Sequence, residues 1–295
     1  MEQIGIKFQH RMIRLRISDT CNFNCSYCSE HDTLPNDKVI NSKNLELLLL
    51  NLEKLYNLEN RFQDLFIWGG EPTLNSELLN FLKKIRNEFN FIKNIEIHSN
   101  LSLNYSEIFI DTVKQLDVKF SSSFHLEYPS KRVFKNFKSF NKNKLLIEIN
   151  LMWHNLEEFD KVKNIKKLNK ELPFSIIPTF QLLDKNFNKV KILLKSSGDF
   201  KDKSIPTSDG NKNYIEIYNY QMKGMLCNIP IDSFIVNTNG DIYFCQNFFL
   251  ENKKSGINIF NDFTVLELQR LTNVTRCIFK NCDCEHIILK QNRNT

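Results

Sequence analysis

Two patterns of apolar residues alternate along the chain as far as about residue 196. Short runs rich in Ile, Val, Leu and Phe are typical of strands, and longer runs with apolar residues at every third or fourth position are typical of helices. The pattern predicts strands at residues 13–18, 64–70, 94–100, 117–125, 144–153 and 173–180, and helices at residues 41–59, 76–89, 106–116 and 157–169. In the first helix Asn41 or Ser42 is the expected N-cap, and the apolar positions are Leu45, Leu48, Leu49, Leu52 and Leu55.

This alternation predicts an α/β protein with a parallel sheet wrapped by helices. Six strand–helix units of this spacing predict a partial (β/α)6 barrel, related to the TIM barrel, in which the loops after the strands build the functional site. The loop that follows the first strand therefore lies at the functional end.

Beyond residue 196 the alternation stops, and Ser, Gly, Asp and Lys become frequent. A hairpin is expected around Asn239 and Gly240, and a short helix at 263–272 follows it. We therefore predict a small C-terminal α+β extension, with domains at residues 1–200 (barrel), 201–222 (connector) and 223–295 (extension).

Composition narrows the class of protein. Of 295 residues, 41% are hydrophobic and 25% charged, which is typical of a soluble globular protein. The net charge of +6 includes no long basic run, so nucleic acid is not an expected partner. The sequence shows neither a secretion signal nor an apolar run of the roughly 20 residues that span a membrane, so we expect a cytoplasmic protein without membrane contact.

The eight cysteines fall into two groups, near the two ends of the chain. In a reducing compartment such groups hold metal or carry out redox chemistry more often than they form disulfides. The first group, Cys21, Cys25 and Cys28, has the spacing CxxxCxxC. Three thiolates can bind three irons of a 4Fe-4S cluster and leave one iron open. The alternative is zinc, which needs four ligands, and His31 is the only nearby fourth donor.

The stretch CNFNCSYC, followed after the second strand by WGGEP, resembles the radical S-adenosylmethionine (SAM) enzymes. The resemblance implies that the open iron binds the methionine part of SAM, and that one electron then cleaves SAM to a 5'-deoxyadenosyl radical. It also implies that Gly69 and Gly70 let the backbone approach the methionine amine, that Glu71 holds this amine, and that Tyr27 lies beside the adenine.

Further positions match the family less specifically. Candidates for contact with the rest of SAM are Ser99, Asn100, Ser122, Asn150, Met152 and Ile177, although capping or core roles explain each of them equally well. His125 and Glu127 follow the fourth strand and are candidate catalytic residues, with His154 as a third candidate. Lys131 and Arg132 could bind an anionic substrate group or simply form charged surface.

The second group contains Cys227, Cys245, Cys277, Cys282 and Cys284. This region resembles the twitch extension, the shorter relative of the SPASM domain, which carries an auxiliary 4Fe-4S cluster. Five cysteines suffice for one such cluster, but the CxxxxCxC ending departs from the usual pairings, so the choice of four stays open. A structural zinc, with His286 as an alternative ligand, suits the same residues.

These features together predict a radical SAM enzyme that abstracts a hydrogen atom from its substrate and oxidises it with the help of the auxiliary cluster. About a dozen residues precede the first strand, which favours a small metabolite, such as a sugar or amino-sugar derivative, over a peptide or protein. A peptide or protein maturase is the first alternative, and a metal-binding or redox-sensing module without SAM chemistry is the second. The expected partners are SAM, the substrate, and an electron donor such as flavodoxin or ferredoxin.

Overall fold

The computed structural model describes residues 12–28, 39–59, 63–196, 204–207, 210–213, 226–227, 233–261, 275–276 and 288–289. Its main feature is an eight-stranded sheet with the order β11-β10-β1-β2-β3-β4-β5-β6. Strands β1 to β6 are parallel and follow one another along the chain, as the sequence predicts. Their bounds are Met12–Ser18, Asp64–Gly69, Asn94–Ser99, Val118–His125, Leu146–Trp153 and Phe174–Pro178.

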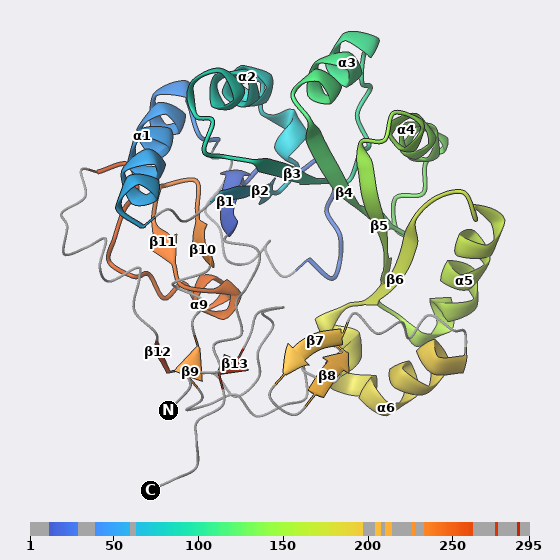
Figure 1. The fold of residues 1–295 in the computed structure, drawn as a ribbon. Coiled ribbons are helices and arrows are strands. Elements are labelled where there is room, and N and C mark those ends of the chain that lie inside the picture. The colour runs from blue at the N-terminus through green and yellow to red at the C-terminus, as the bar shows by residue number, and fades with distance from the viewer. Residues whose placement is uncertain are drawn as a thin grey trace, which may run out of the picture.

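Helices cover the outer face of the curved sheet (Figure 1). They are α1 (Ser42–Glu59), α2 (Leu78–Glu88), α3 (Glu107–Gln115), α4 (Lys131–Lys142), α5 (Phe159–Leu168) and α6 (Phe180–Ser196), with short 3-10 turns at Pro72–Leu74 and Leu156–Glu158. The alternation of parallel strands and outer helices confirms the predicted α/β partial barrel.

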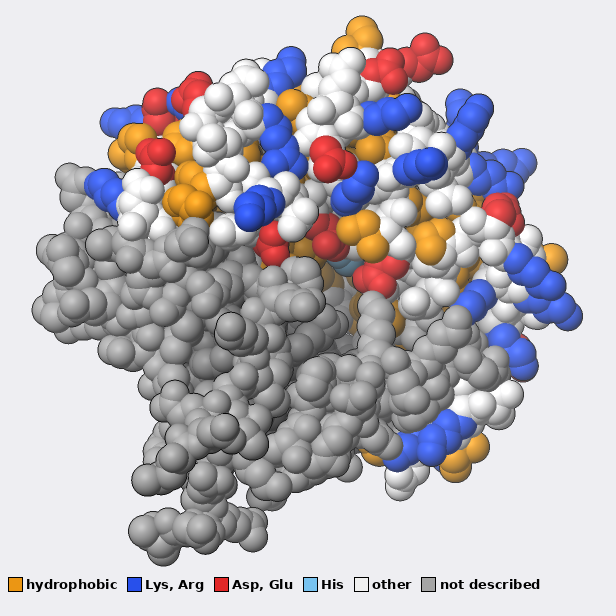
Figure 2. Space-filling view, in the orientation of Figure 1, with side chains coloured by type: hydrophobic (Ala, Val, Ile, Leu, Met, Phe, Trp, Pro, Cys, Tyr) orange, Lys and Arg blue, Asp and Glu red, His pale blue; other side chains and the backbone are white. Residues whose placement is uncertain are grey.

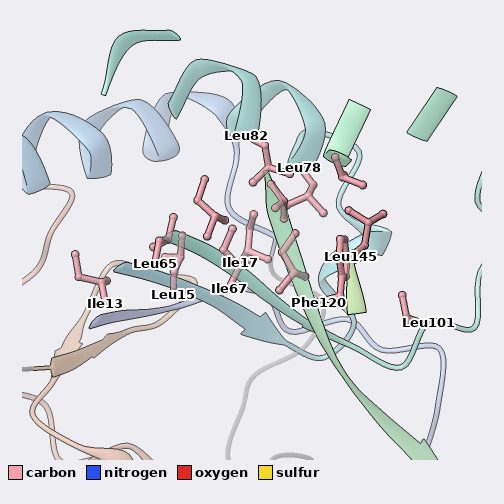
Figure 3. Packing of buried hydrophobic residues seen from close by; sticks show 14 of the residues in the cluster. Ile13, Leu15, Ile17, Leu65, Ile67, Leu78, Leu82, Leu101, Phe120 and Leu145 are labelled. Carbon is pink, nitrogen blue, oxygen red and sulfur yellow. The ribbon is translucent and has the colours of Figure 1, made fainter. Parts of the chain in front are cut away.

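The first helix shows how the sequence sets this packing. Asn41 caps α1, because its Oδ1 accepts a hydrogen bond from the Asn44 N–H at 2.9 Å. The predicted apolar positions are all buried, with at most 3% of each side chain exposed: Leu45, Leu48, Leu49, Leu52 and Leu55. Apolar side chains of β1 and β2 pack in the same core against Leu78 and Leu82 of α2 (Figure 3).

The predicted C-terminal hairpin is present, and it belongs to the main sheet. Strand β10 (Ser233–Val236) pairs in parallel with β1, and β11 (Ile242–Tyr243) pairs antiparallel with β10. At the turn Gly240 has φ +83°, a conformation that favours glycine, and its N–H donates to the Asn237 carbonyl. Helix α9 (Gln246–Leu250) follows directly.

Two smaller sheets complete the described parts. Strands β7 (Ser204–Thr207) and β8 (Gly210–Asn213) form an antiparallel pair inside the segment predicted as a connector. Strand β9 (Leu226–Cys227) lies between β12 (Thr275–Arg276) and β13 (Ile288–Leu289). The helix predicted at 263–272 lies outside the described residues.

The charged residues are spread over the outer surface. Figure 2 shows Lys and Arg side chains interspersed with acidic, apolar and uncharged ones over the helices. Within the described part of the chain, none of the helices combines the length and the apolarity that crossing a bilayer requires.

Candidate active site

The three cysteines of the first group lie in the loop that follows β1, at the carboxyl end of the parallel strands. Cys25 is buried, whereas Cys21 and Cys28 are partly exposed. The Cys28 N–H donates to the Cys25 carbonyl at 3.1 Å, which closes a turn between these two residues. The loop thus presents three thiols from a short, internally bonded segment.

The end of β4 packs directly on this loop through His125. Its Nδ1 lies 2.7 Å from the Tyr27 hydroxyl and 3.3 Å from the Cys25 sulfur. Tyr27 also stacks on the ring of His154, with ring centroids 4.6 Å apart. Two of the predicted site residues, Tyr27 and His125, are therefore in direct contact.

Glu127 binds the backbone of the cysteine loop. One carboxylate oxygen accepts from the Ser26 N–H at 2.9 Å, and the other accepts from the Ser26 hydroxyl. Burial alone would raise the pKa of Glu127, but these hydrogen bonds hold it below its ordinary value. Both oxygens are occupied, so the contacts of Glu127 favour positioning of the loop over contact with a substrate.

A neighbouring aromatic pair adds to this attachment. Phe23 stacks on Tyr128 with ring centroids 4.3 Å apart, and the Tyr128 hydroxyl accepts from the Asn24 N–H at 3.0 Å. Neither Tyr128 nor Ser26 belongs to the residues that the sequence motifs single out. Nothing in the sequence alone links them, because each contact joins residues more than 100 positions apart.

Burial dominates the protonation states at this contact. It raises the pKa of the Cys25 thiol to about 12, with further contributions from the charges of Cys28, Glu127 and Cys21. It lowers the pKa of His125 to about 4, so the imidazole is neutral at pH 7. Metal binding reverses the preference of a buried thiol for its protonated form, because a coordinated thiol is deprotonated.

The WGGEP segment at the end of β2 packs against the chain just before the cysteines. The Gly70 and Glu71 N–H groups each donate at 2.8 Å, to the carbonyls of Ser18 and Thr20. A Cβ on Gly69 would lie 2.2 Å from the Ser18 carbonyl oxygen, and one on Gly70 would lie 2.3 Å from that of Thr20. The glycines are therefore required for close contact between this segment and the loop.

Glu71 is fully buried and joins two strand ends. Its Oε1 accepts from Thr73 and from the Ser99 hydroxyl at 2.7 Å, and its Oε2 accepts from the Asn100 N–H at 2.7 Å. Burial raises the pKa of Glu71, and these hydrogen bonds oppose that effect. In this arrangement Glu71 fixes the end of β3 beside the glycines.

Asn100 extends this network to the cysteine loop. Its Nδ2 donates to Asn22 Oδ1 at 2.9 Å, and Asn22 in turn donates to the Ser102 hydroxyl at 2.7 Å. Ser122 lies on the helix side of β4, where its hydroxyl donates to the Ser99 carbonyl at 2.6 Å and is fully buried. This position favours a role for Ser122 in joining β3 to β4.

The other predicted residues lie on the inner face of the sheet. Asn150, Met152 and Ile177 are partly buried and alternate with core residues along β5 and β6. The strand register aligns them in two adjacent rows, Ser123–Asn150–Ser175 and His125–Met152–Ile177. One row presents hydroxyl and amide groups, and the next presents an imidazole with two apolar side chains.

Two more histidines lie near these rows. His98, on β3, contacts the hydroxyls of Ser121 and Ser123 at 3.1 and 2.7 Å, and burial lowers its pKa to about 4. His154 lies 3.2 Å from Glu158 and 3.7 Å from Glu127. The predicted candidate His154 is thus close to Tyr27 and Glu127, whereas Lys131 and Arg132 lie in the exposed first turn of α4.

The comparisons with known proteins decide the family. The family model described as the radical SAM superfamily matches residues 15–180, more than half of the chain. The chain belongs to the radical SAM superfamily. Members of this superfamily are enzymes that use a 4Fe-4S cluster and SAM.

Sequence relatives cover only part of this radical SAM chain. A GTP 3',8-cyclase of Limosilactobacillus fermentum is 30% identical over 94 residues, which are 31% of this chain and 26% of the relative. A GTP 3',8-cyclase of Staphylococcus aureus is 33% identical over 106 residues, which are 34% and 30% of the two chains. The chain therefore matches less than a third of the length of these relatives.

Solved structures share the fold over most of the chain. Streptococcus suis SuiB bound to the precursor peptide SuiA has a TM-score of 0.62 and 16% identity, covering 90% of this chain and 65% of SuiB. The structure of anSMEcpe with bound AdoMet and Cp18Cys peptide has a TM-score of 0.58 and 17% identity, covering 87% and 80%. BtrN in complex with AdoMet and 2-DOIA has a TM-score of 0.50 and 16% identity, covering 86% and 80%.

The donor set of the cysteine loop fits the cluster of this superfamily. Its three thiols come from one loop, and that loop is fixed by hydrogen bonds to the ends of β2, β3 and β4. Among the described residues, no three His, Cys, Asp or Glu side chains converge on a single metal position. The ligands of a 4Fe-4S cluster bind different irons, whereas a zinc ion needs four donors at one position, and the fourth donor named for zinc, His31, lies outside the described residues.

The second cysteine group is described only in part. The register of the small sheet places Cys227 between Thr275 and Ile288, so the chain on either side of the last three cysteines lies beside it. Cys245 is partly exposed and immediately precedes α9. Cys277, Cys282 and Cys284, together with His286 and His31, lie outside the described residues.

Proposed function

We propose that this chain cleaves SAM reductively and abstracts a hydrogen atom from its substrate. The observation that carries the proposal is the cysteine loop itself, which presents three thiols and contacts His125, a member of one inner row of β4, β5 and β6. When bound, a 4Fe-4S cluster supplies the electron that cleaves SAM to methionine and a 5'-deoxyadenosyl radical, and this radical takes the hydrogen atom.

The chain's own residues position the reactants. Cys21, Cys25 and Cys28 hold the cluster, and the backbone at Gly69 and Gly70 approaches the methionine amine. Glu71 fixes the end of β3 beside these glycines, because it accepts hydrogen bonds from Ser99 and Asn100. The remaining proposed contacts with SAM come from Tyr27, Asn150, Met152 and Ile177. Ser122 is fully buried on the helix side of β4, so its proposed role is to join β3 to β4.

The extension carries the second part of the proposal. Four of its five cysteines would hold an auxiliary 4Fe-4S cluster, which would supply an acceptor for one electron from the substrate radical, so that the product would be oxidised by two electrons overall. The pairing of β9 supports an auxiliary site, because Cys227 pairs with Thr275 and with Ile288, which lie on either side of the last three cysteines. An electron donor such as flavodoxin or ferredoxin supplies the first cluster, and the protein works in the cytoplasm.

The inner face favours a small polar substrate, such as a sugar or amino-sugar derivative. Ser123, Asn150 and Ser175 present hydrogen-bonding groups in one row, and His125 lies at the strand end above them. His125 is the proposed group for hydrogen bonding or proton exchange with substrate, and Glu127 fixes the cysteine loop through Ser26. A peptide substrate is the second candidate, because the solved structures of SuiB and anSMEcpe with a similar fold contain bound peptides.

The test is anaerobic reconstitution followed by addition of SAM and a strong reductant. We expect 5'-deoxyadenosine from the parent and none from Cys25→Ala, with Cys245→Ala still forming it. Absence of 5'-deoxyadenosine from a fully reconstituted parent would contradict the proposal. Deuterium transfer into 5'-deoxyadenosine from labelled amino sugars or from labelled peptides distinguishes the two substrate classes.

A further inference from the structure

A buried ion pair lies directly before the cysteine loop. The Arg16 Nε, on β1, donates to Oδ1 of Asp19 at 2.6 Å, and the two side chains are 2% and 3% exposed. Asp19 precedes Cys21 by two residues, so the Cα atoms of these residues are at most about 7 Å apart. The pair is therefore next to the first cysteine.

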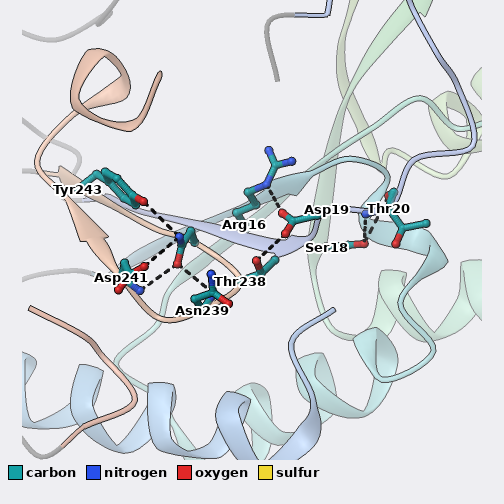
Figure 4. Close-up of polar contacts among 9 residues, drawn as sticks. Arg16, Ser18, Asp19, Thr20, Thr238, Asn239, Asp241 and Tyr243 are labelled. Carbon is teal, nitrogen blue, oxygen red and sulfur yellow. Dashed lines mark hydrogen bonds and ion pairs between the residues drawn. The ribbon is translucent and has the colours of Figure 1, made fainter. Parts of the chain in front are cut away.

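The third member of this contact comes from the other end of the chain. The Thr238 hydroxyl, in the turn between β10 and β11, donates to Oδ2 of Asp19 at 2.7 Å (Figure 4). The turn is itself fixed, since Asn237 Oδ1 accepts from the N–H groups of Asn239 and Asp241. The C-terminal hairpin thus fixes the orientation of the Asp19 carboxylate.

Arg16 is also enclosed by aromatic rings. Its Cζ lies 5.4 Å from the Trp68 ring centroid and 5.7 Å from that of Phe249, in α9. Aromatic faces attract a cation but leave its net charge in place. Asp19 places an opposite charge beside the guanidinium and close to the first cysteine, which makes the position of that carboxylate electrostatically important.

We propose that Thr238 holds the Asp19 carboxylate against Arg16, and that the charge of this carboxylate keeps the reduction potential of the cluster at the cysteine loop low. The proposal rests on the proposed function, because it requires a 4Fe-4S cluster at that loop. Reduction adds negative charge to a cluster, so losing the negative charge of Asp19, or moving it away from the loop, stabilises the reduced form and raises the potential. A raised potential would make the cluster a weaker reductant of SAM.

The experiment measures the reduction potential of this cluster in reconstituted full-length variants, by a redox titration followed by electron paramagnetic resonance. The signal to follow is the one that Cys25→Ala removes. Asp19→Asn keeps the shape and removes the charge, so the ratio of reduced to oxidised cluster at a fixed solution potential should rise at least about tenfold. Thr238→Val should raise this ratio by a smaller factor, and Thr238→Ser should match the parent.

A buried carboxylate elsewhere in the fold provides the control. Asp64 is 9% exposed, accepts from Asn94, and lies at the amino end of β2, opposite the cysteine loop. Asp64→Asn should leave the potential unchanged. A rise in Asp64→Asn equal to that in Asp19→Asn, or no rise in Asp19→Asn, overturns the proposal.

Two further outcomes bear on the proposal. If Asp19→Asn takes up no iron, Thr238→Val and Thr238→Ser provide the test. Equal reduction potentials in these two variants overturn the proposal. The potential is read without turnover. A parent that binds the cluster but does not cleave SAM therefore contradicts the proposed function, while the comparison of potentials still tests this proposal.

Discussion

At the residue scale, the buried carboxylate of Glu71 organises the end of the sheet. It accepts hydrogen bonds from Thr73, Ser99 and Asn100, and none of its side chain is exposed. A buried donor that loses its acceptor costs about 1–3 kcal/mol. The network therefore depends on a group that accepts at both oxygens.

Replacing Glu71 by Gln tests this directly. The amide nitrogen of Gln is a donor. At least one N–H or hydroxyl that donates to Glu71 in the parent would therefore face another donor in the variant. We expect Glu71→Gln to lower the free energy of unfolding by about 3 kcal/mol, measured by urea denaturation. Glu88→Gln, at a side chain that is 57% exposed, is the control and should change it by less than about 0.5 kcal/mol.

The lowered pKa of His98 makes the stability of the fold depend on pH. Burial, followed by the charge of Arg14, lowers its pKa from 6.5 to about 4, although Glu148 opposes the shift. Between these two values the unfolded chain binds a proton that the folded protein does not, so stability falls as the pH drops from 6.5 toward 4, by up to about 3 kcal/mol.

The measurement compares thermal unfolding midpoints of the parent and His98→Gln at pH 5 and pH 7.5. A neutral Gln keeps a hydrogen-bonding group beside Ser121 and Ser123 but cannot take up the proton. We expect the midpoint of the parent to fall more on acidification than that of the variant. Equal falls in both proteins would assign the pH dependence to other groups.

At the scale of elements, the contact between the end of β2 and the loop after β1 holds the site together. Gly70 and Glu71 donate to carbonyls of that loop, and no side chain fits between the two segments. A Cβ at Gly70 would have to displace backbone, which cannot yield as a side chain can. The spacing of the two segments is therefore fixed by glycine.

Gly70→Ala should destabilise the fold by more than about 3 kcal/mol and lower iron uptake at the cysteine loop. Gly256→Ala is the matched control: its φ is +85°, but no atom lies within 4 Å of the added Cβ. Only backbone strain of about 1 kcal/mol is expected there, with normal iron uptake. Urea denaturation and iron analysis check both variants, and similar losses in the two would refute the role of close packing.

Much of the element structure was predictable because it depends on local periodicity. The leucines of α1 and the six parallel strands are examples, and CxxxCxxC with WGGEP predicted the region of the candidate site. The pairing of β10 with β1 was not predictable, because it joins segments about 220 residues apart. The same holds for Glu127 with Ser26, since short-range patterns carry no information on contacts between distant loops.

At the scale of the whole molecule, the first described strand and a hairpin more than 200 residues later share one sheet. Strand β10 lies along β1, and Phe234 and Val236 are fully buried in the same core as Ile13 and Leu15. Helix α1 is tied to the same region, because Asn51 donates to the carbonyls of Ile259 and Asn261. The barrel strands and the hairpin therefore depend on each other for folding.

Two truncations separate the hairpin from the last three cysteines. A chain that ends after residue 231 exposes the edge of β1 and part of its core, so we expect aggregation on expression. A chain that ends after residue 261 keeps the hairpin and should stay folded, with about four irons instead of the about eight expected for two cubic clusters in the parent. Circular dichroism and iron analysis measure both results. A well-folded chain ending at 231 would contradict the dependence of the barrel on β10. About eight irons in the chain ending at 261 would contradict the proposal that the auxiliary cluster needs ligands from among Cys277, Cys282 and Cys284.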